Sequence, residues 1–327
     1  MSKLTVLDVG HGNCAVLSSE DINVVVDAAN RTHLLCYLEL NSITVIDLIV
    51  ISHTDLDHVG GLINVLCSPE VVVKRLVINP DSQKKSKIWG DIRALIDDKV
   101  MSGALDLIMS VHSGKTYGWA VISESLKLEV ISPTVTMALG GPGLRLPAGS
   151  QKVTSNSASI VIRVIYNNKP VALITGDMDM IALSEIRRLG TSIKAQNLVF
   201  PHHGGMPGNA DPIEFTRSLM DMVCPEFVLF SNGRGLHGTP KLEIIQTIRA
   251  VSPAPYIACT QLSENCCEAP LAREDYIPLI YSAGADDDSF CAGTVQIDLD
   301  TGLPNQEGHA AHSVFTGGLP KRLCGRI

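Results

Sequence analysis

The hydrophobic positions of the first third of the chain fall into short β-branched runs separated by glycine, asparagine and polar turns. Such runs predict strands at residues 4–8, 14–17, 23–27, 47–52 and 71–78. A helical period appears between them, over residues 31–40 and 59–66. Alternating strands and helices predict an α/β protein in which helices pack outside sheets.

The pattern continues less regularly to residue 250. Residues 82–110 predict a surface helix and a second short one, and residues 134–154, rich in Gly and Pro, predict a flexible loop. The remaining predicted elements are strands at 126–131, 159–166, 170–175, 197–200 and 227–231 and helices at 180–189, 212–222 and 241–251. Beyond residue 250 only 294–299 predicts a strand, so we divide the chain into a domain, 1–250, and a C-terminal extension, 251–327, packed on it.

Composition narrows the class of protein. The 327 residues are 45% hydrophobic, which predicts a folded chain. Acidic residues outnumber basic ones by 34 to 26, which argues against a protein that coats nucleic acid by bulk charge. Neither a signal peptide nor an apolar run of roughly 20 residues is apparent, and the nine cysteines lack regular pairing. We therefore expect a cytoplasmic protein with reduced thiols and no membrane segment.

The strongest chemical signal is a cluster of four metal-binding side chains within six residues. His53, Asp55, Asp57 and His58 follow an apolar strand, and Gly60-Gly61 permits a tight turn beside them. Alternation directs His53 and Asp55 to one side, while Asp57 and His58 can face a second ion. Imidazole and carboxylate ligands suit Zn²⁺, Mn²⁺ or Fe²⁺. The simpler alternative is a charged turn with a capping Asp, in which the four polar groups have no cation.

The motif His53-x-Asp55-x-Asp57-His58 resembles the metal-binding signature of the metallo-β-lactamase superfamily, in the variant where the second His is Asp. Other motifs occur in the order found in the ComEC-like branch, the hydrolase domain of DNA-uptake competence proteins. They are Asp8-Val9-Gly10-His11-Gly12-Asn13, Asn156-Ser157-x-Ser159, Gly176-Asp177, Pro201-His202-His203-Gly204 and His237-Gly238. His11 and Asn13 depart from the usual Gln and Asp. The resemblance covers residues 3–250 and implies an αββα sandwich with two metals at the sheet edges.

The resemblance also implies roles for the metal-binding residues. Asp177 would bridge two divalent ions, Zn²⁺ or Mn²⁺. The loop after the strand at 47–52 would supply further ligands to the same ions. One histidine of the His202-His203 pair would complete the set of metal ligands. We favour His202 as the ligand and His203 as a group that contacts substrate, and the reverse assignment stays open. Paired core histidines are the simpler alternative.

Further positions are candidates for orienting ligands or binding substrate. Asn156, Ser157 and Ser159 stand where relatives have a metal-binding His, although a turn before a strand would use the same residues. Asp8 ends a strand, as Asp27 does, and we expect Asp8 to orient a metal-bound His. Arg234 lies in the glycine-rich loop of His237, where either side chain can meet a phosphate; a surface turn is the alternative.

Two cations that share a hydroxide favour hydrolysis, and we predict a phosphodiesterase or nuclease acting on DNA, RNA or nucleotides. Asp57 would orient the hydroxide, and His203 or His237 would assist the leaving group. Asp55 makes the site richer in oxygen, which favours Mn²⁺ as well as Zn²⁺. A protein partner in a multicomponent system is a further expectation. The alternatives are a hydrolase of a small ester, lactone or β-lactam, and a metal-stabilised regulatory module without catalysis.

A second thiol-rich cluster lies near the C-terminus. Cys259, Cys266, Cys267 and Cys291 supply enough thiols for a structural zinc site. Their spacing lacks a close Cys-x2-Cys pair, which favours buried small hydrophobic side chains instead. Both interpretations remain open from the sequence.

Overall fold

The computed structural model describes residues 2–146, 151–271, 281–285 and 287–326. Within these residues the larger sheet has seven strands in the order β15-β1-β2-β3-β5-β7-β8. Its strands are β1 (Lys3–Val6), β2 (Ala15–Ser19), β3 (Ile22–Val26), β5 (Leu48–Ile51), β7 (Arg75–Ile78), β8 (Asp106–Ile108) and β15 (Val295–Asp298). The strands β3, β5, β7 and β8 are parallel.

The second sheet has six strands in the described residues, in the order β14-β13-β12-β11-β10-β9. Its strands are β9 (Leu126–Ser132), β10 (Val161–Tyr166), β11 (Lys169–Ile174), β12 (Asn197–Val199), β13 (Phe227–Phe230) and β14 (Tyr256–Cys259). From β11 to β14 the strands are parallel, with Ala172 opposite Asn197 and Asn197 opposite Phe227. Two short strands, β4 (Val45–Ile46) and β6 (Val72–Val73), pair separately.

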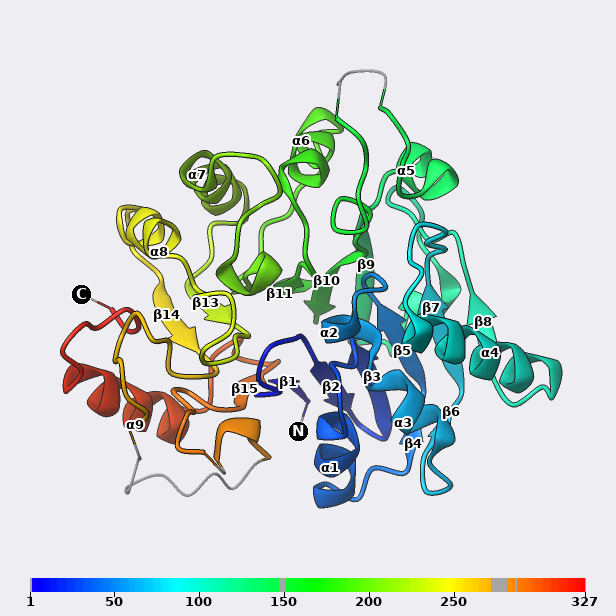
Figure 1. Ribbon diagram of the computed structural model, residues 1–327, viewed down its shortest axis with the longest axis horizontal. Coiled ribbons are helices and arrows are strands. Elements are labelled where there is room, and N and C mark those ends of the chain that lie inside the picture. Colours follow the sequence, from blue (N-terminus) through cyan, green and yellow to red (C-terminus); the bar gives the residue numbers. More distant parts are fainter. Residues whose placement is uncertain (1, 147–150, 272–280, 286, 327) are drawn as a thin grey trace.

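Helices cover the outer faces of both sheets (Figure 1). The helices of the first half are α1 (His33–Leu40), α2 (Leu56–Val59), α3 (Leu62–Cys67), α4 (Lys87–Met101) and α5 (Val135–Gly140). Those of the second half are α6 (Met180–Arg188), α7 (Pro212–Val223), α8 (Leu242–Arg249) and α9 (Gln306–Gly317). Short 3₁₀ turns occur at Gly118–Ala120, Pro201–Gly204 and Ala283–Ala285.

Three hydrophobic layers hold this arrangement together. The central layer joins the two sheets through side chains such as Val50 of β5 and Ile174 of β11. A second layer packs α6, α7 and α8 on the six-stranded sheet, and a third packs α1, α3 and α4 on the seven-stranded sheet. The alternating side-chain directions of each strand supply one face to the central layer and the other to the helices. The predicted α/β sandwich with outer helices is therefore confirmed.

Several predicted elements differ from the structure. The second short helix expected within 82–110 is instead the strand β8, which pairs with β7, because a three-residue strand carries too little periodicity to be recognised. The helix expected at 59–66 is divided into α2 and α3 at Gly60-Gly61. The expected loop 134–154 contains α5, and its residues 147–150 lie outside the described part.

The chain beyond residue 250 contributes to both sheets. Strand β14 forms one edge of the six-stranded sheet, and β15 forms one edge of the seven-stranded sheet. The weakly patterned tail contains α9, whose His312 and Thr316 are buried. No described helix combines the length and apolar character needed to cross a bilayer. All nine cysteines lie in the described part, and none of them forms a disulfide.

Candidate metal centre

The site forms where parallel strands of both sheets end. The loop that holds residues 53–58 follows β5, Asp177 follows β11, and the turn Pro201–Gly204 follows β12. Parallel strands end at the same edge of a sheet, so each chain reversal delivers its side chains to one region. Residues more than a hundred positions apart in the sequence meet there as a result.

Asp57, His58, Asp177 and His203 form one close group, with one ligand atom from each within 4.8 Å of the others. His58 Nε2 lies 3.0 Å from Asp177 Oδ1. His203 Nε2 lies 3.3 Å from Asp57 Oδ2 and 3.7 Å from Asp177 Oδ1. Three members are buried and Asp57 is partly exposed, so the group sits at the bottom of an accessible site.

Asp177 faces histidines on both sides. Its Oδ1 atom faces His58 and His203, while its Oδ2 atom lies 3.7 Å from both His53 Nε2 and His202 Nδ1. Asp55 Oδ2 lies 3.9 Å from His53 Nε2 on this second side. A carboxylate with its two oxygens directed to separate groups of ligands has the geometry of a bridge between two cations.

The hydrogen bonds of the imidazole rings suit a cation. His203 Nδ1 donates to the Ser231 carbonyl at 2.7 Å, and His58 Nδ1 donates to Asp27 Oδ2 at 2.8 Å. A carbonyl and a carboxylate only accept, so in the neutral rings each Nε2 carries a lone pair that faces the group. These Nε2 atoms and Asp177 Oδ1 are buried, and apart from contacts with one another and with Asp57 they have no polar partner among the described residues. A divalent cation would satisfy all of them.

The charges of the metal-free group compensate one another. Burial acts to raise the pKa of Asp177 and Asp57, but the facing histidines outweigh it, and both pKa values lie below the ordinary range. Burial acts to lower the pKa of His58, but the carboxylates of Asp177 and Asp27 raise it well above the usual value. Burial lowers the pKa of His53, which keeps that ring neutral and able to bind a metal.

Asp27, at the end of β3, holds the metal-binding loop. Its Oδ1 accepts from the Ser52 backbone N–H at 2.6 Å, and its Oδ2 accepts from the Ser52 hydroxyl and from Asn13 Nδ2. The Ser52 hydroxyl also lies 3.0 Å from His53 Nδ1. Together with its bond to His58, these contacts make Asp27 the carboxylate that orients the histidines. The sequence offered only a weak signal for this role, namely a carboxylate at a strand end.

Asp8 does not have the orienting role that we expected. Its carboxylate accepts from the Ser282 hydroxyl at 2.5 Å and from the backbone N–H groups of Gly284 and Gly10. It therefore anchors the chain beyond residue 280 to the end of β1. Asp8 and Asp27 both end strands, and only the packing of the chain decides which of them meets His58.

His202 and His203 have different surroundings. His203 joins Asp57, His58 and Asp177, whereas His202 lies beside Asn156, whose Nδ2 is 3.2 Å from His202 Nδ1. The His202 side chain is 35% exposed against 3% for His203. This geometry favours the reverse of our preferred assignment, with His203 as the ligand.

Two residues that the motif analysis did not assign lie against the metal-binding carboxylates. His11 Nε2 is 3.3 Å from Asp57 Oδ2, and its ring centroid is 4.5 Å from that of His203. Lys84 forms an ion pair with Asp55. His11 belongs to the recognised motif at residues 8–13, where it replaces the usual Gln, whereas Lys84 carries no signal in the sequence.

The remaining candidates occupy varied positions. Ser157 donates to Asp179, which caps α6 as its Oδ1 accepts from two backbone N–H groups there, so Ser157 is remote from the group of four. The Arg234 guanidinium donates to three backbone carbonyls in residues 262–268 and so holds the C-terminal extension. His237 is exposed, with its ring centroid 4.7 Å from that of His11.

A cleft of about 870 Å³ opens above the site. Asp55 and Asp57 line it together with basic or imidazole side chains. These are His11, Arg31, His33, His202, Arg234, His237 and Lys241, and Asp287 adds a third carboxylate. The carboxylates thus meet a cavity whose other ionisable groups are mostly basic, which suits an anionic ligand near bound cations.

Comparison with known proteins agrees with this architecture. Residues 7–73, which include the loop from His53 to His58, match the family model described as the metallo-beta-lactamase superfamily. Two sheets with helices on both outer faces define the same fold class, an αββα metallo-β-lactamase sandwich. No curated protein matches the chain.

Solved structures of similar shape include Igni18, a metallo hydrolase from the archaeon Ignicoccus hospitalis. The two chains are 14% identical with a TM-score of 0.47, and the match covers 79% of this chain and 94% of Igni18. YhfI from Bacillus subtilis, a metallo-beta-lactamase fold protein, is similar at 11% identity and a TM-score of 0.44, covering 79% and 96%. A diphosphatase of the PhnP family is similar at 13% identity and a TM-score of 0.41, covering 75% and 80%.

Proposed function

We propose that this protein is a metal-dependent hydrolase that cleaves phosphodiester bonds in nucleic acids or nucleotides. The observation that carries the proposal is the position of Asp177, which faces His58 and His203 with one oxygen and His53 with the other. Buried Nε2 atoms whose polar contacts among the described residues are with the other proposed ligands support ligation on both sides. The order of motifs along the chain supports a place in the ComEC-like branch.

When bound, two divalent cations supply the Lewis acidity that activates water and neutralises charge on substrate oxygens. His53, Asp55 and Asp177 would hold one cation, and Asp57, His58, Asp177 and His203 would hold the other. The oxygen-rich first set supports Mn²⁺ as well as Zn²⁺. Asp27 and Ser231 hold the Nδ1 protons, so that each Nε2 lone pair stays directed at its ion.

Asp57 orients water, and a histidine at the cleft donates a proton. Asp57 Oδ2 lies 3.3 Å from the Nε2 atoms of both His11 and His203, so this carboxylate can orient the attacking water. With His203 assigned as a ligand, His237 becomes the proton donor to the leaving oxygen. Its exposed ring and its contact with His11 at the cleft support this role.

The charge of the cleft supports a phosphate-containing substrate. Arg31 is exposed on the cleft wall, and Lys241 lies close to His237, whose carbonyl accepts from Lys241 Nζ. The chain as a whole carries a formal charge of −8, so these groups form a local basic surface on an acidic protein. Such a surface attracts a polyanion to the reaction site without general nucleic-acid binding.

The test is hydrolysis of bis-p-nitrophenyl phosphate, single- and double-stranded DNA, and RNA by protein loaded with Mn²⁺ or Zn²⁺. Asp57→Ala should lower kcat by at least about 100-fold, since it removes both a ligand and the group that orients water. Asp21→Ala is the matched control, because Asp21 is exposed at the β2–β3 turn, the end of β3 opposite to Asp27. Its activity should equal that of the unmodified protein.

Other outcomes would contradict the proposal. Turnover of esters or β-lactams without any cleavage of phosphodiesters would assign the site to a different substrate class. Tight metal binding without turnover of any of these compounds would indicate a regulatory module. Equal activity of Asp57→Ala and the unmodified protein would exclude Asp57 from the reaction.

A further inference from the structure

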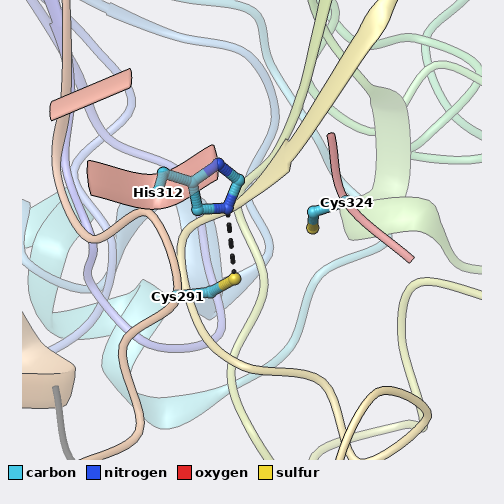
Figure 2. Close-up of side chains that lie close together, drawn as sticks. All are labelled: Cys291, His312 and Cys324. Carbon is cyan, nitrogen blue, oxygen red and sulfur yellow. Dashed lines mark hydrogen bonds between the residues drawn. The ribbon is translucent and has the colours of Figure 1, made fainter. Parts of the chain in front are cut away.

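A second group of metal-binding side chains lies in the C-terminal extension, away from the cleft. Cys291, His312 and Cys324 place one ligand atom each within 4.8 Å of the others, and all three side chains are buried (Figure 2). They come from the segment before β15, from α9 and from the segment after α9. Of the four cysteines in the predicted cluster, Cys291 belongs to this close group, and Cys259 and Cys266 interact electrostatically with Cys324.

The His312 ring is held from both sides. Its Nδ1 atom lies 2.8 Å from the Tyr256 hydroxyl, and its Nε2 atom lies 3.3 Å from Cys291 Sγ, as the dashed line in Figure 2 marks. A partner on Nδ1 fixes the orientation of the ring and leaves Nε2 directed at the thiols. Ligand histidines in metal sites are commonly held in this manner.

Cys259 lies next to this group. It is the last residue of β14 and has no solvent exposure. Its thiol interacts electrostatically with the thiols of both Cys324 and Cys291. Cys259 is therefore the thiol available to add a fourth ligand to Cys291, His312 and Cys324.

We propose that Cys259, Cys291, His312 and Cys324 form a structural site for one thiophilic divalent cation, Zn²⁺. Three sulfurs and one imidazole nitrogen are a common ligand set for structural zinc, and at tetrahedral geometry their separations are about 3.4–3.8 Å. Cys291, His312 and Cys324 already lie within 4.8 Å of one another, whereas Cys259 lies outside that group and would have to move towards it on binding. All four side chains are buried, so the site is closed to substrate and its role is structural.

The surroundings also suit the charge of such a site. On binding, each thiol releases its proton to solvent, so three thiolates and Zn²⁺ together carry one negative charge. Arg249 interacts electrostatically with Cys324, and its Nη2 atom donates to the Arg322 carbonyl two residues before it. The Arg249 guanidinium balances this negative charge.

A cation here would join four separate segments of the extension. It would connect the end of β14, the segment before β15, helix α9 and the segment that follows it. The two sheets receive their edge strands from this extension, so the site would stabilise both edges. It is independent of the proposed hydrolysis, because it shares no ligand with the group around Asp177.

Substitution with Co²⁺ tests the site in the full chain. Thiolate-to-cobalt charge transfer absorbs in the near ultraviolet, and no cysteine belongs to the group around Asp177, so this band reports on the thiol site alone. We expect the band in the unmodified protein and in Asp177→Asn, together with about one equivalent of tightly bound zinc in Asp177→Asn. Cys291→Ser and Cys324→Ser should each lose both signals. Cys14→Ser is the matched control, a buried thiol in a different hydrophobic layer.

Measurements on protein with all its thiols intact test the site even if the serine variants fail to fold. Absence of the charge-transfer band, with no zinc retained by Asp177→Asn, would overturn the proposal. A disulfide among Cys259, Cys291 and Cys324 in protein purified without reductant, again with no bound zinc, would do the same. Failure of the phosphodiesterase assay would leave both readouts unaffected, so the two proposals can be rejected separately.

Discussion

The Nδ1 atom of His58 donates a hydrogen bond of 2.8 Å to Oδ2 of Asp27, and neither side chain has any solvent exposure. Asp27 ends β3, and His58 lies in α2, directly after the loop that follows the neighbouring strand β5. The bond therefore connects the scaffold of the seven-stranded sheet to a proposed metal ligand. Substitution of either partner should change metal binding more than it changes the fold.

Asp27→Asn should weaken metal binding by about 10- to 100-fold while the protein remains folded, because His58 loses the carboxylate that fixes its tautomer. Metal titration by calorimetry measures the effect. Asp8→Asn is the control, since Asp8 is an equally buried carboxylate at a strand end but contacts Ser282 and Gly284 instead of a histidine. Equal losses of affinity in the two variants would contradict the orienting role of Asp27.

His203→Ala should lower metal affinity by more than about 100-fold, and His202→Ala by less than about threefold. The reason is that His203 Nε2 faces Asp57 and Asp177, while the half-exposed His202 has Asn156 beside its Nδ1 atom. Zinc content after dialysis against a weak chelator measures both. The opposite order of effects would make His202 the ligand.

The stability of the metal-free protein should fall as the pH rises above about 6.5. Burial opposes the charged form of His58, but the carboxylates of Asp177 and Asp27 raise its pKa above the unfolded value of 6.5. The stability that the charged His58 contributes is therefore complete below pH 6.5 and is lost as the pH rises through the higher pKa of the folded protein. The lowered pKa values of Asp57 and Asp177 add stability above the unfolded value of 3.8, which is lost on acidification. Thermal unfolding with and without Mn²⁺ should therefore give a Tm difference that grows as the pH rises above about 6.5. A constant difference would argue against this account.

Lys84→Ala should strengthen metal binding at the side of His53 and Asp55 by up to about fivefold at low salt. Lys84 forms an ion pair with Asp55, and its ammonium group therefore competes with a metal cation for that carboxylate. Both side chains are 30% exposed, so solvent weakens the ion pair and the loss of metal affinity that it causes is small. Lys85→Ala removes the same charge from the neighbouring, exposed position and should have little effect. Competitive titration with a metal-sensitive dye distinguishes the two.

Gly176→Ala should destabilise the protein by about 2–3 kcal/mol. Gly176 has a φ of 52°, and an added Cβ would lie 2.7 Å from Ser52 Cβ, next to the hydroxyl that contacts Asp27 and His53. Gly90→Ala should have the opposite effect and stabilise the protein by about 0.5–1 kcal/mol. The reason is that Gly90 lies inside α4 with open space where a Cβ would be added. Urea unfolding measures both changes.

The elements with strong periodicity could be predicted from the sequence, and the weakly patterned ones could not. The strands of the parallel core consist of apolar runs, and α6 lies within one residue of the predicted helix at 180–189. By contrast β8 has three residues, β14 has four, and α9 contains two glycines. These elements depend on pairing with a neighbouring strand or on packing, which local periodicity does not record.

The sequence alone was enough to recognise the loop from His53 to His58, because four ligand types within six residues must be neighbours in any fold. It was not enough to choose between Asp8 and Asp27 or between His202 and His203, and it gave no sign that Cys324 and His312 lie beside Cys291. Those choices follow from strand pairing, from left-handed backbone torsions of 54° and 56° at the two histidines, and from the packing of α9. The direction of a side chain depends on backbone torsion and packing, and residues far apart in the chain meet only after the sheets have formed.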